Sequence, residues 1–306
     1  MDKKYKLTHH TKEVDGHTLH QIKALKSFGH VYKGDLGGWI EDYRNLSQLG
    51  TAWVDDDAMV YDNATVYDDT WVYDKARVYG DAKVYNDAMI WGNAGVFDHA
   101  KVYGHAQVLD SAMVYGDARV YGHACVSDKA EVYGSAKVYD HALIFDHAHV
   151  YGHACVYDRA KVCDRACVCD DAHICGDAWV YGHAMVYGRA QVYGDGKIQG
   201  DIEIRENDEI KDNRSYLVFN NTWSSGRQFV YVLSNKRWHV GCFDGTGEEL
   251  IKKAYKDSEK SGKMYELYVH LAEQVAKEQQ QAQERLDKAL KQTQNDLAYW
   301  LRSYPY

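Results

Sequence analysis

The sequence predicts a mainly β protein whose central part is a solenoid of short stacked strands. Two observations predict this fold. First, residues 51–206 repeat every six residues, twenty-six times, without an insertion. Second, each hexad places a small residue, nearly always Ala, two positions before a Val or Ile, as in Asp81-Ala82-Lys83-Val84-Tyr85-Asn86. A short unit repeated at a fixed period is typical of solenoids.

The six-residue period fits one strand and one corner. Because six is a multiple of two, Ala and Val lie on one side of a short strand, and the residues between and after them lie on the other. We therefore expect Ala and Val in the core and Lys, Met and Tyr outside. The Gly, Asp or Asn that follows the aromatic residue tolerates the positive φ of a turn. The same period would bury no consistent stripe of an α-helix.

Three hexads close one triangular turn, so residues eighteen apart are expected to stack at about 4.8 Å. Residues 51–206 then give between eight and nine turns. A stack of this size is a rod of roughly 40 Å.

The repeat resembles the hexapeptide repeat of left-handed parallel β-helix proteins. Gly37-Gly38-Trp39-Ile40-Glu41, followed by Asn45-Leu46-Ser47-Gln48 and Ala52-Trp53-Val54, is similar to the start of YdcK-like proteins. The resemblance covers roughly residues 37–200 and implies a single-stranded left-handed parallel β-helix. The handedness comes from the resemblance alone, because ordinary parallel crossovers are right-handed. YdcK-like proteins are loosely labelled as transferases without an established reaction.

Composition limits the function classes. The formal net charge of −9 argues against general affinity for nucleic acid or for an anionic membrane. No apolar run reaches eighteen residues and no signal-peptide pattern is present at the start, so we expect a cytoplasmic protein. The seven Cys are expected to remain thiols. Residues 51–206 hold 22 Asp and 3 Glu against 13 Lys and Arg.

The chain divides into four predicted parts. Residues 1–36 form an N-terminal β-hairpin cap, with strands at 5–8 and 18–22 around a turn at 14–17. Residues 37–206 form the β-helix. Residues 207–260 form a small antiparallel sheet, with strands at 216–219, 229–233 and 238–243, followed by a helix that Thr246 caps. Residues 261–306 form a long helix, read as a coiled coil or as a helix packed on the rod. Its apolar stripe comprises Leu267, Leu271, Val275, Ala282, Leu286, Ala289, Thr293, Leu297 and Trp300.

Outward-facing residues form columns, and we expect a partner to bind there. The predicted partner-binding residues belong to two Tyr columns. These are Tyr61, Tyr79, Tyr115, Tyr133 and Tyr151 in the first, and Tyr67, Tyr85, Tyr103, Tyr121, Tyr139 and Tyr157 in the second. Alternatively, the stacked rings only stabilise adjacent strands, each pair by about 0.5–1 kcal/mol.

Histidine and cysteine also recur along the rod. His105, His123 and His141 form a column that is a weak metal candidate, because ligands in a straight line cannot converge on one ion from one subunit. Two Cys and His pairs, His149 with Cys167 and Cys155 with His173, would be neighbours. Neither has an oxyanion hole or an enclosing pocket predicted beside it, so we expect no catalytic residue. Cys163, Cys169 and Cys175 belong to three different faces and form no metal motif.

These features predict a non-enzymatic binding or scaffold protein that displays stacked Tyr and Asp columns to a protein partner. We expect no cofactor, no resident metal, no membrane contact and no direct nucleic-acid contact, with self-association through the C-terminal helix as a dimer or trimer. One alternative is an acidic inhibitor or decoy, of a phage type, that occupies a nucleic-acid-binding host protein. A second is an acyltransferase trimer, which the fold suggests by analogy only, since no loop leaves the hexads.

Overall fold

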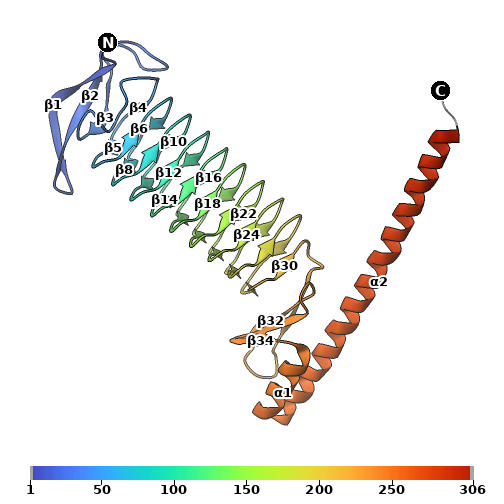
Figure 1. Ribbon diagram of the computed structural model, residues 1–306. Helices are drawn as coiled ribbons and strands as arrows, with labels where there is room; N and C mark the ends of the chain where they lie inside the picture. The colour runs from blue at the N-terminus through green and yellow to red at the C-terminus, as the bar shows by residue number, and fades with distance from the viewer. Residues whose placement is uncertain (1–2, 304–306) are drawn as a thin grey trace. The chain divides into compact units, whose positions relative to one another are not determined.

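The computed structural model describes residues 3–303, and the chain divides into two compact units, residues 1–215 and 216–306. Figure 1 shows the first unit as a stack of coils with a hairpin at its N-terminal end. The second unit contains a small sheet and both helices. No described helix has an apolar stretch long enough to cross a membrane.

The solenoid strands are two residues long and recur at six-residue intervals, from β4 (Trp53–Val54) to β30 (Glu209–Ile210). Every third strand pairs in parallel, so Lys101 lies opposite both Lys83 and Arg119. Three sheets result, and the predicted stacking of residues eighteen apart is confirmed. Sheet A contains β5 (Met59–Val60), sheet C contains β6 (Thr65–Val66) and sheet D contains β4.

The solenoid has about ten turns, more than the eight to nine predicted. The additional turns lie outside the regular hexads. β3 (Leu36–Ile40) pairs in parallel with β5 at the N-terminal end. At the other end β30, which lies beyond residue 206, pairs with β27 (Gln191–Val192). Backbone pairing therefore extends further than the Ala–Val pattern from which the length was predicted.

The core is the column of small and β-branched residues that the pattern predicts. At the two inward positions from Ala52 to Val192, the side chains are at most 1% exposed. Burying one Val side chain contributes about 1.5–3 kcal/mol relative to leaving it exposed. The tube is therefore stabilised mainly by many repeats of one apolar contact.

The corners explain why Asp is so abundant. Asp or Asn at the corner adopts a positive φ, for example +58° at Asp158, where Gly stands in other repeats. The Asp carboxylate then accepts a hydrogen bond from the backbone N–H of the residue eighteen positions later. Asp158 accepts from Gly176 at 2.9 Å and Asp164 from Gly182 at 2.8 Å. These carboxylates join successive turns.

The predicted N-terminal hairpin is confirmed, with longer strands. β1 (Tyr5–Val14) pairs antiparallel with β2 (His17–Ala24), and β2 pairs antiparallel with β3. The hairpin thus extends sheet A of the solenoid to twelve strands.

Aromatic rings and one buried lysine cover the first turn. The Trp53 ring makes edge contacts with Phe28 at 5.5 Å and with Tyr5 at 6.3 Å between centroids. The Lys4 ammonium donates to the backbone carbonyls of Ala52 at 2.8 Å and of Leu49 at 3.3 Å. Burial lowers the pKa of Lys4 to about 8. Lys4 satisfies carbonyls at the end of the stack, which would otherwise be buried without a donor.

The sheet of the second unit has four antiparallel strands where three were predicted. They are β31 (Tyr216–Asn220), β32 (Gln228–Val232), β33 (Arg237–Val240) and β34 (Phe243–Gly245). The prediction of one strand over 238–243 was wrong, because Gly241 has a φ of +55° and turns the chain back. β33 and β34 therefore pair with each other.

Helix α1 (Gly247–Asp257) begins at the predicted cap. The Thr246 hydroxyl accepts from the Glu249 N–H at 3.3 Å, and the Glu249 carboxylate accepts from the Thr246 N–H at 2.8 Å. Helix α2 (Glu259–Ser303) confirms the long helix. Its first half packs in the core of the second unit through Tyr265, Val269 and Ala272.

The apolar stripe predicted for the long helix is not its packing face. Leu267 and Leu271 are 65% and 50% exposed. The buried residues lie on another side of the helix, where the aromatic side chains of the small sheet cover them. Further along, Leu286 and Leu297 are also more than half exposed.

Candidate functional site

The two predicted Tyr columns are continuous stacks of parallel rings. In the second column, the centroids of Tyr103 and Tyr121 lie 4.9 Å apart with an interplanar angle of 1°. Phe97 continues the first column between Tyr79 and Tyr115 at the same spacing. The stacks comprise Tyr61, Tyr79, Phe97, Tyr115, Tyr133 and Tyr151, and Tyr67, Tyr85, Tyr103, Tyr121, Tyr139 and Tyr157.

Stacking decides which part of each ring is available. Neighbouring rings cover the two faces of an inner ring, so its edge and its hydroxyl are what a partner can reach. Burial raises the pKa of Tyr103, and it raises the pKa of Tyr139 to about 12. The hydroxyls therefore remain protonated at neutral pH and can donate hydrogen bonds.

Tyr61 does not belong to the accessible part of the first column. Its side chain is 2% exposed, because the hairpin covers it through Leu19. Its hydroxyl donates to the Asp15 carboxylate at 3.2 Å. Tyr61 therefore joins the hairpin to the solenoid, and the next Tyr of the first column, one turn later, is Tyr79.

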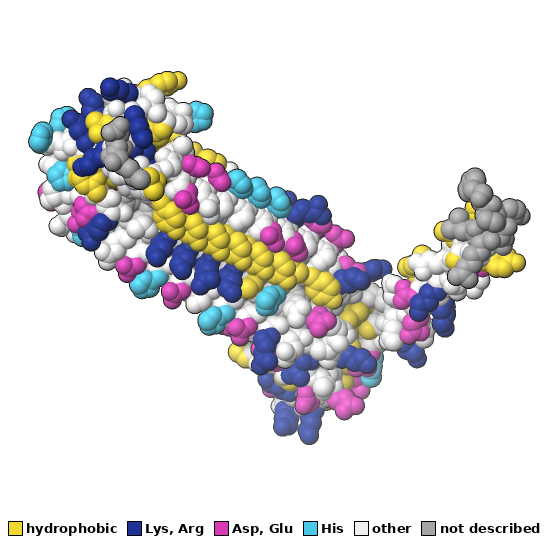
Figure 2. All heavy atoms as spheres, turned by 45° about the horizontal axis from the view of Figure 1, so that its top comes forward, with side chains coloured by type: hydrophobic (Ala, Val, Ile, Leu, Met, Phe, Trp, Pro, Cys, Tyr) yellow, Lys and Arg dark blue, Asp and Glu magenta, His cyan; other side chains and the backbone are white. Residues whose placement is uncertain are grey.

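A row of four basic side chains runs beside the second Tyr column and was missed in the sequence. Lys83, Lys101, Arg119 and Lys137 point outward from successive strands of sheet C. None of the four pairs with a carboxylate within residues 3–303. Like charges stacked at strand spacing are destabilising. Figure 2 shows a straight hydrophobic band on the solenoid with basic and His side chains along it.

The sequence already contained the information for this row, because its four residues are eighteen positions apart and residues at that spacing stack. Gly104 and Gly122 stand at two corners beside the row where other repeats have Asp, but five corner acids adjoin it: Asp81, Asp87, Asp98, Asp117 and Asp140. The row therefore places four stacked positive charges between acidic corners of the rod.

The predicted His column is present. The rings of His105 and His123 stack at 4.8 Å, and those of His123 and His141 at 4.9 Å. Parallel rings in a line cannot direct their nitrogens to one ion. Within the described residues, two other groups converge within 4.8 Å: His17 with Glu41 and Asp62, and Asp146 with Cys163 and Asp164.

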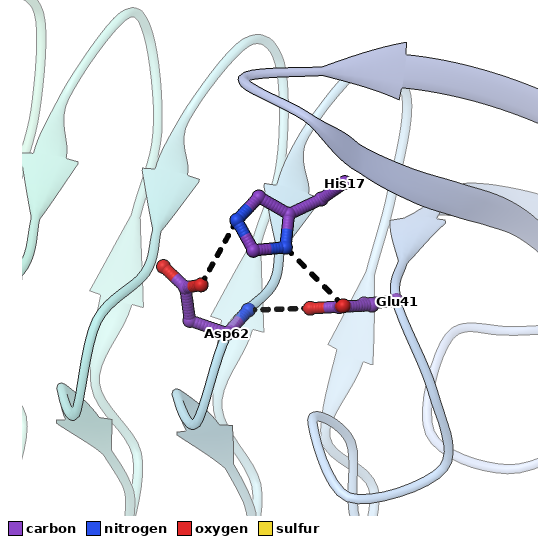
Figure 3. Close-up of side chains that lie close together, drawn as sticks. All are labelled: His17, Glu41 and Asp62. Carbon is purple, nitrogen blue, oxygen red and sulfur yellow. Dashed lines mark hydrogen bonds and ion pairs between the residues drawn. The ribbon is translucent and has the colours of Figure 1, made fainter.

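His17 lies between two carboxylates where the hairpin meets the solenoid (Figure 3). Its Nδ1 lies 3.2 Å from Glu41 Oε1, and its Nε2 lies 3.1 Å from Asp62 Oδ1. The hydrogen bond with Glu41 is the main cause that raises the pKa of His17. Because the two nitrogens face different carboxylates, a protonated ring suits this geometry better than a metal ion does.

The predicted Cys and His pairs are in register, since His149 lies opposite Cys167 and Cys155 lies opposite His173. Burial raises the pKa of both thiols. A catalytic thiol needs the opposite shift, because the thiolate is the nucleophile. The pairs therefore lack the activation that covalent catalysis requires.

Cys163, Cys169 and Cys175 interrupt all three outward columns within one turn. Cys163 is 3% exposed, and the Trp179 indole N–H donates to its sulfur at 3.1 Å. Cys169 is 6% exposed. At Cys175 a hollow of about 320 Å³ is lined by Tyr157, His173, Cys175, Gln191 and Tyr193. Of these three positions, Cys175 is therefore the one that opens into a hollow.

Comparison with known proteins supports the repeat assignment. The YdcK β-solenoid repeat matches residues 58–74, which include β5, β6 and β7 (Trp71–Val72). A search of curated proteins gives no match. The resemblance seen in the sequence and the observed coil agree. The repeat region of this chain is a parallel β-solenoid, and residues 58–74 within it match the YdcK β-solenoid repeat.

Proposed function

We propose that this protein is a non-enzymatic binding scaffold, whose solenoid presents Tyr edges and basic side chains to a protein partner. The observation that carries the proposal is the pairing of two ladders on one face. The column Tyr67–Tyr157 and the row Lys83–Lys137 both follow the repeat of the solenoid, so their spacing is fixed by the backbone.

Rigidity supports binding. A partner that meets preordered side chains does not have to offset the cost of ordering the scaffold, since the scaffold side chains are already fixed. The Tyr rings are held by their neighbours at 4.9 Å. Tyrosine supplies both apolar contact area and a hydrogen-bonding hydroxyl, which is why it is common at interfaces.

The Asp columns contribute less to this proposal than the sequence indicated. Corner carboxylates such as Asp158 and Asp164 are engaged by backbone N–H groups of the next turn. Their structural role accounts for their number. An acidic decoy would have to use the oxygens that remain, and it would bind a basic partner, whereas the basic row favours an acidic partner.

Helix α2 supports self-association as part of the same proposal. Leu286, Leu290 and Leu297 are 53%, 52% and 57% exposed and follow each other at spacings of four and seven. This is the spacing of core positions in a coiled coil. These leucines pack against the same leucines of a second copy of α2. Sedimentation of the full chain and of a Leu286→Lys/Leu290→Lys variant tests it, with a smaller mass expected for the variant.

The binding proposal is tested by capture on the immobilised full chain with two matched charge variants. Lys101→Glu/Arg119→Glu reverses the basic row. Lys75→Glu/Lys129→Glu makes the same change in net charge at exposed positions on another corner. We expect a protein captured by the wild type and by the control variant to be lost with the first variant.

Two results would contradict the proposal. Equal capture by all three proteins would show that the basic row is not the binding surface. Thermal stabilisation of the wild type by coenzyme A would instead indicate acyl-transfer chemistry. Repeating the capture at low and high salt also tests the decoy alternative, because salt weakens exposed charge contacts.

A further inference from the structure

The hollow at Cys175 lies where the second Tyr column lacks one ring. Tyr157 is the last ring of the continuous stack, and Cys175 occupies the next position of the column. Tyr193 stands one repeat beyond Cys175 in the same column. In the intact part of the column, one repeat separates ring centroids by 4.9 Å. Positions 157 and 193 are therefore two ring spacings apart, with a thiol between them.

We propose that this opening is a binding slot for one aromatic side chain of a partner protein. A ring entering the slot would complete the stack and lie one ring spacing from Tyr157 on one side and from Tyr193 on the other. Aromatic pairs favour centroid separations of about 4.5–7 Å. The hollow of about 320 Å³ is at the lower end of the range for ligand sites.

The comparison with the other two interruptions supports the slot. All three columns carry a Cys in this turn, but Trp179 covers Cys163, and Cys169 is 6% exposed. At Cys175 the outward neighbours are His173 and Gln191, which leave the hollow open. Their polar groups can fix the orientation of an indole N–H or a phenol hydroxyl.

Charge on the same face indicates what accompanies the ring. The basic row lies on sheet C, as does His173, and Lys137 is two strands from His173. At strand spacing this is about 10 Å, which an extended chain covers in about three residues. Lys101 and Arg119 lie further along the same line. The partner is therefore an extended segment with an aromatic residue and, from about three residues away, a run of acidic residues.

Single-stranded nucleic acid fits this face less well. Such binding uses aromatic faces on which successive bases stack. The inner rings of the column cover each other, as Tyr121 and Tyr139 do at 4.9 Å, so the slot accepts one ring at most.

The proposal rests on the proposed binding function and is tested by anisotropy of a labelled peptide, Trp-Gly-Ser-Glu-Glu-Glu-Glu, added to the full chain. Companion probes replace Trp by Leu, or Glu by Lys, or are a single-stranded oligonucleotide. The protein variants are Cys175→Tyr, which fills the slot, and Cys175→Ala, which keeps it open. We expect Cys175→Ala to bind like the wild type, and Cys175→Tyr to bind at least tenfold more weakly and to melt no lower.

Tyr193→Ala removes one wall and provides a second test should the Tyr variant fail to fold; we expect it to weaken binding as well. Equal affinity of wild type and Cys175→Tyr, equal affinity for the Trp and Leu peptides, or preference for the oligonucleotide would overturn the slot. If the wild type does not bind the Trp peptide but still captures a protein through Lys101 and Arg119, the aromatic slot is refuted and the basic row is not. The proposed function would then stand.

Discussion

The corner carboxylates allow a sharp prediction, because one side chain meets two separate requirements. Asp158 occupies a positive φ of +58°, and it accepts the Gly176 N–H at 2.9 Å. Substitution by Ala removes the acceptor and leaves a Cβ in the left-handed region. Substitution by Gly removes the acceptor but relieves the backbone. Substitution by Asn retains both an acceptor oxygen and tolerance of this conformation.

The magnitudes separate the three variants. A left-handed conformation costs an ordinary residue about 1–2 kcal/mol. A hydrogen bond contributes about 0.5–1.5 kcal/mol net to stability. Because the Asp158 carboxylate is exposed, we place the contribution of its hydrogen bond within this range. We therefore expect Asp158→Ala to lower stability by about 2 kcal/mol, whereas the gain and loss in Asp158→Gly nearly cancel. Asp158→Asn should cost less than about 1 kcal/mol.

Thermal melting with amide hydrogen exchange at Gly176 measures both effects, since solenoids open locally and a single global value is insufficient. Asp171→Ala is the control: it removes the same charge two corners further along the chain, at a position without a positive φ. It should change stability by less than about 0.5 kcal/mol. If Ala and Gly at position 158 are equally destabilising, or if Gly176 exchange is unchanged in both, the account of the corners is refuted.

Other predictions concern the core, the cap and the helix. Ile144→Ala should destabilise the solenoid by about 2–5 kcal/mol by leaving a cavity, with a smaller loss in Ile144→Val, both read from urea unfolding. His17 should stabilise hairpin docking fully below its ordinary pKa of 6.5, and this should be lost as pH rises through its raised pKa. His17→Gln should remove that pH dependence of amide exchange in β2, and an unchanged profile would contradict it. Thr246→Ala should lower second-unit stability by about 0.5–2 kcal/mol through loss of the cap, whereas Thr246→Ser should not.

The sequence was sufficient for most features that the six-residue period controls, although the basic row, which has the same spacing of eighteen, was missed. Alternation placed Ala and Val inside, and a spacing of eighteen placed Tyr121 against Tyr103 and Tyr139. Turn chemistry placed Asp and Gly at corners with a positive φ. The cap at Thr246 followed from local chemistry in the same way. These are short-range properties, or exact multiples of a short-range one.

Features that depend on side-chain reach could not be predicted. Nothing in the pattern indicates that Lys4 reaches the carbonyl of Ala52, or that the hairpin buries Tyr61. The three Cys that interrupt the columns look equivalent in sequence, yet Cys163 and Cys169 are buried, whereas Cys175 lines a hollow. The packing face of α2 was also unpredictable, because Tyr265 and Val269 compete with Leu267 and Leu271 for burial, and the shape of the sheet decides.

The most direct test of the central claim is one distance along sheet C. Lys83 in β9 (Lys83–Val84) and Gln191 in β27 (Gln191–Val192) both point outward and are six strands apart in that sheet. Spin labels at these positions, in a variant whose native Cys are replaced, should be about 29 Å apart, six strand spacings. Moving the second label to His173 should shorten the distance by about 5 Å, one spacing. Distances that do not change by one strand spacing for each eighteen residues would contradict the stacked coil on which the proposed binding face depends.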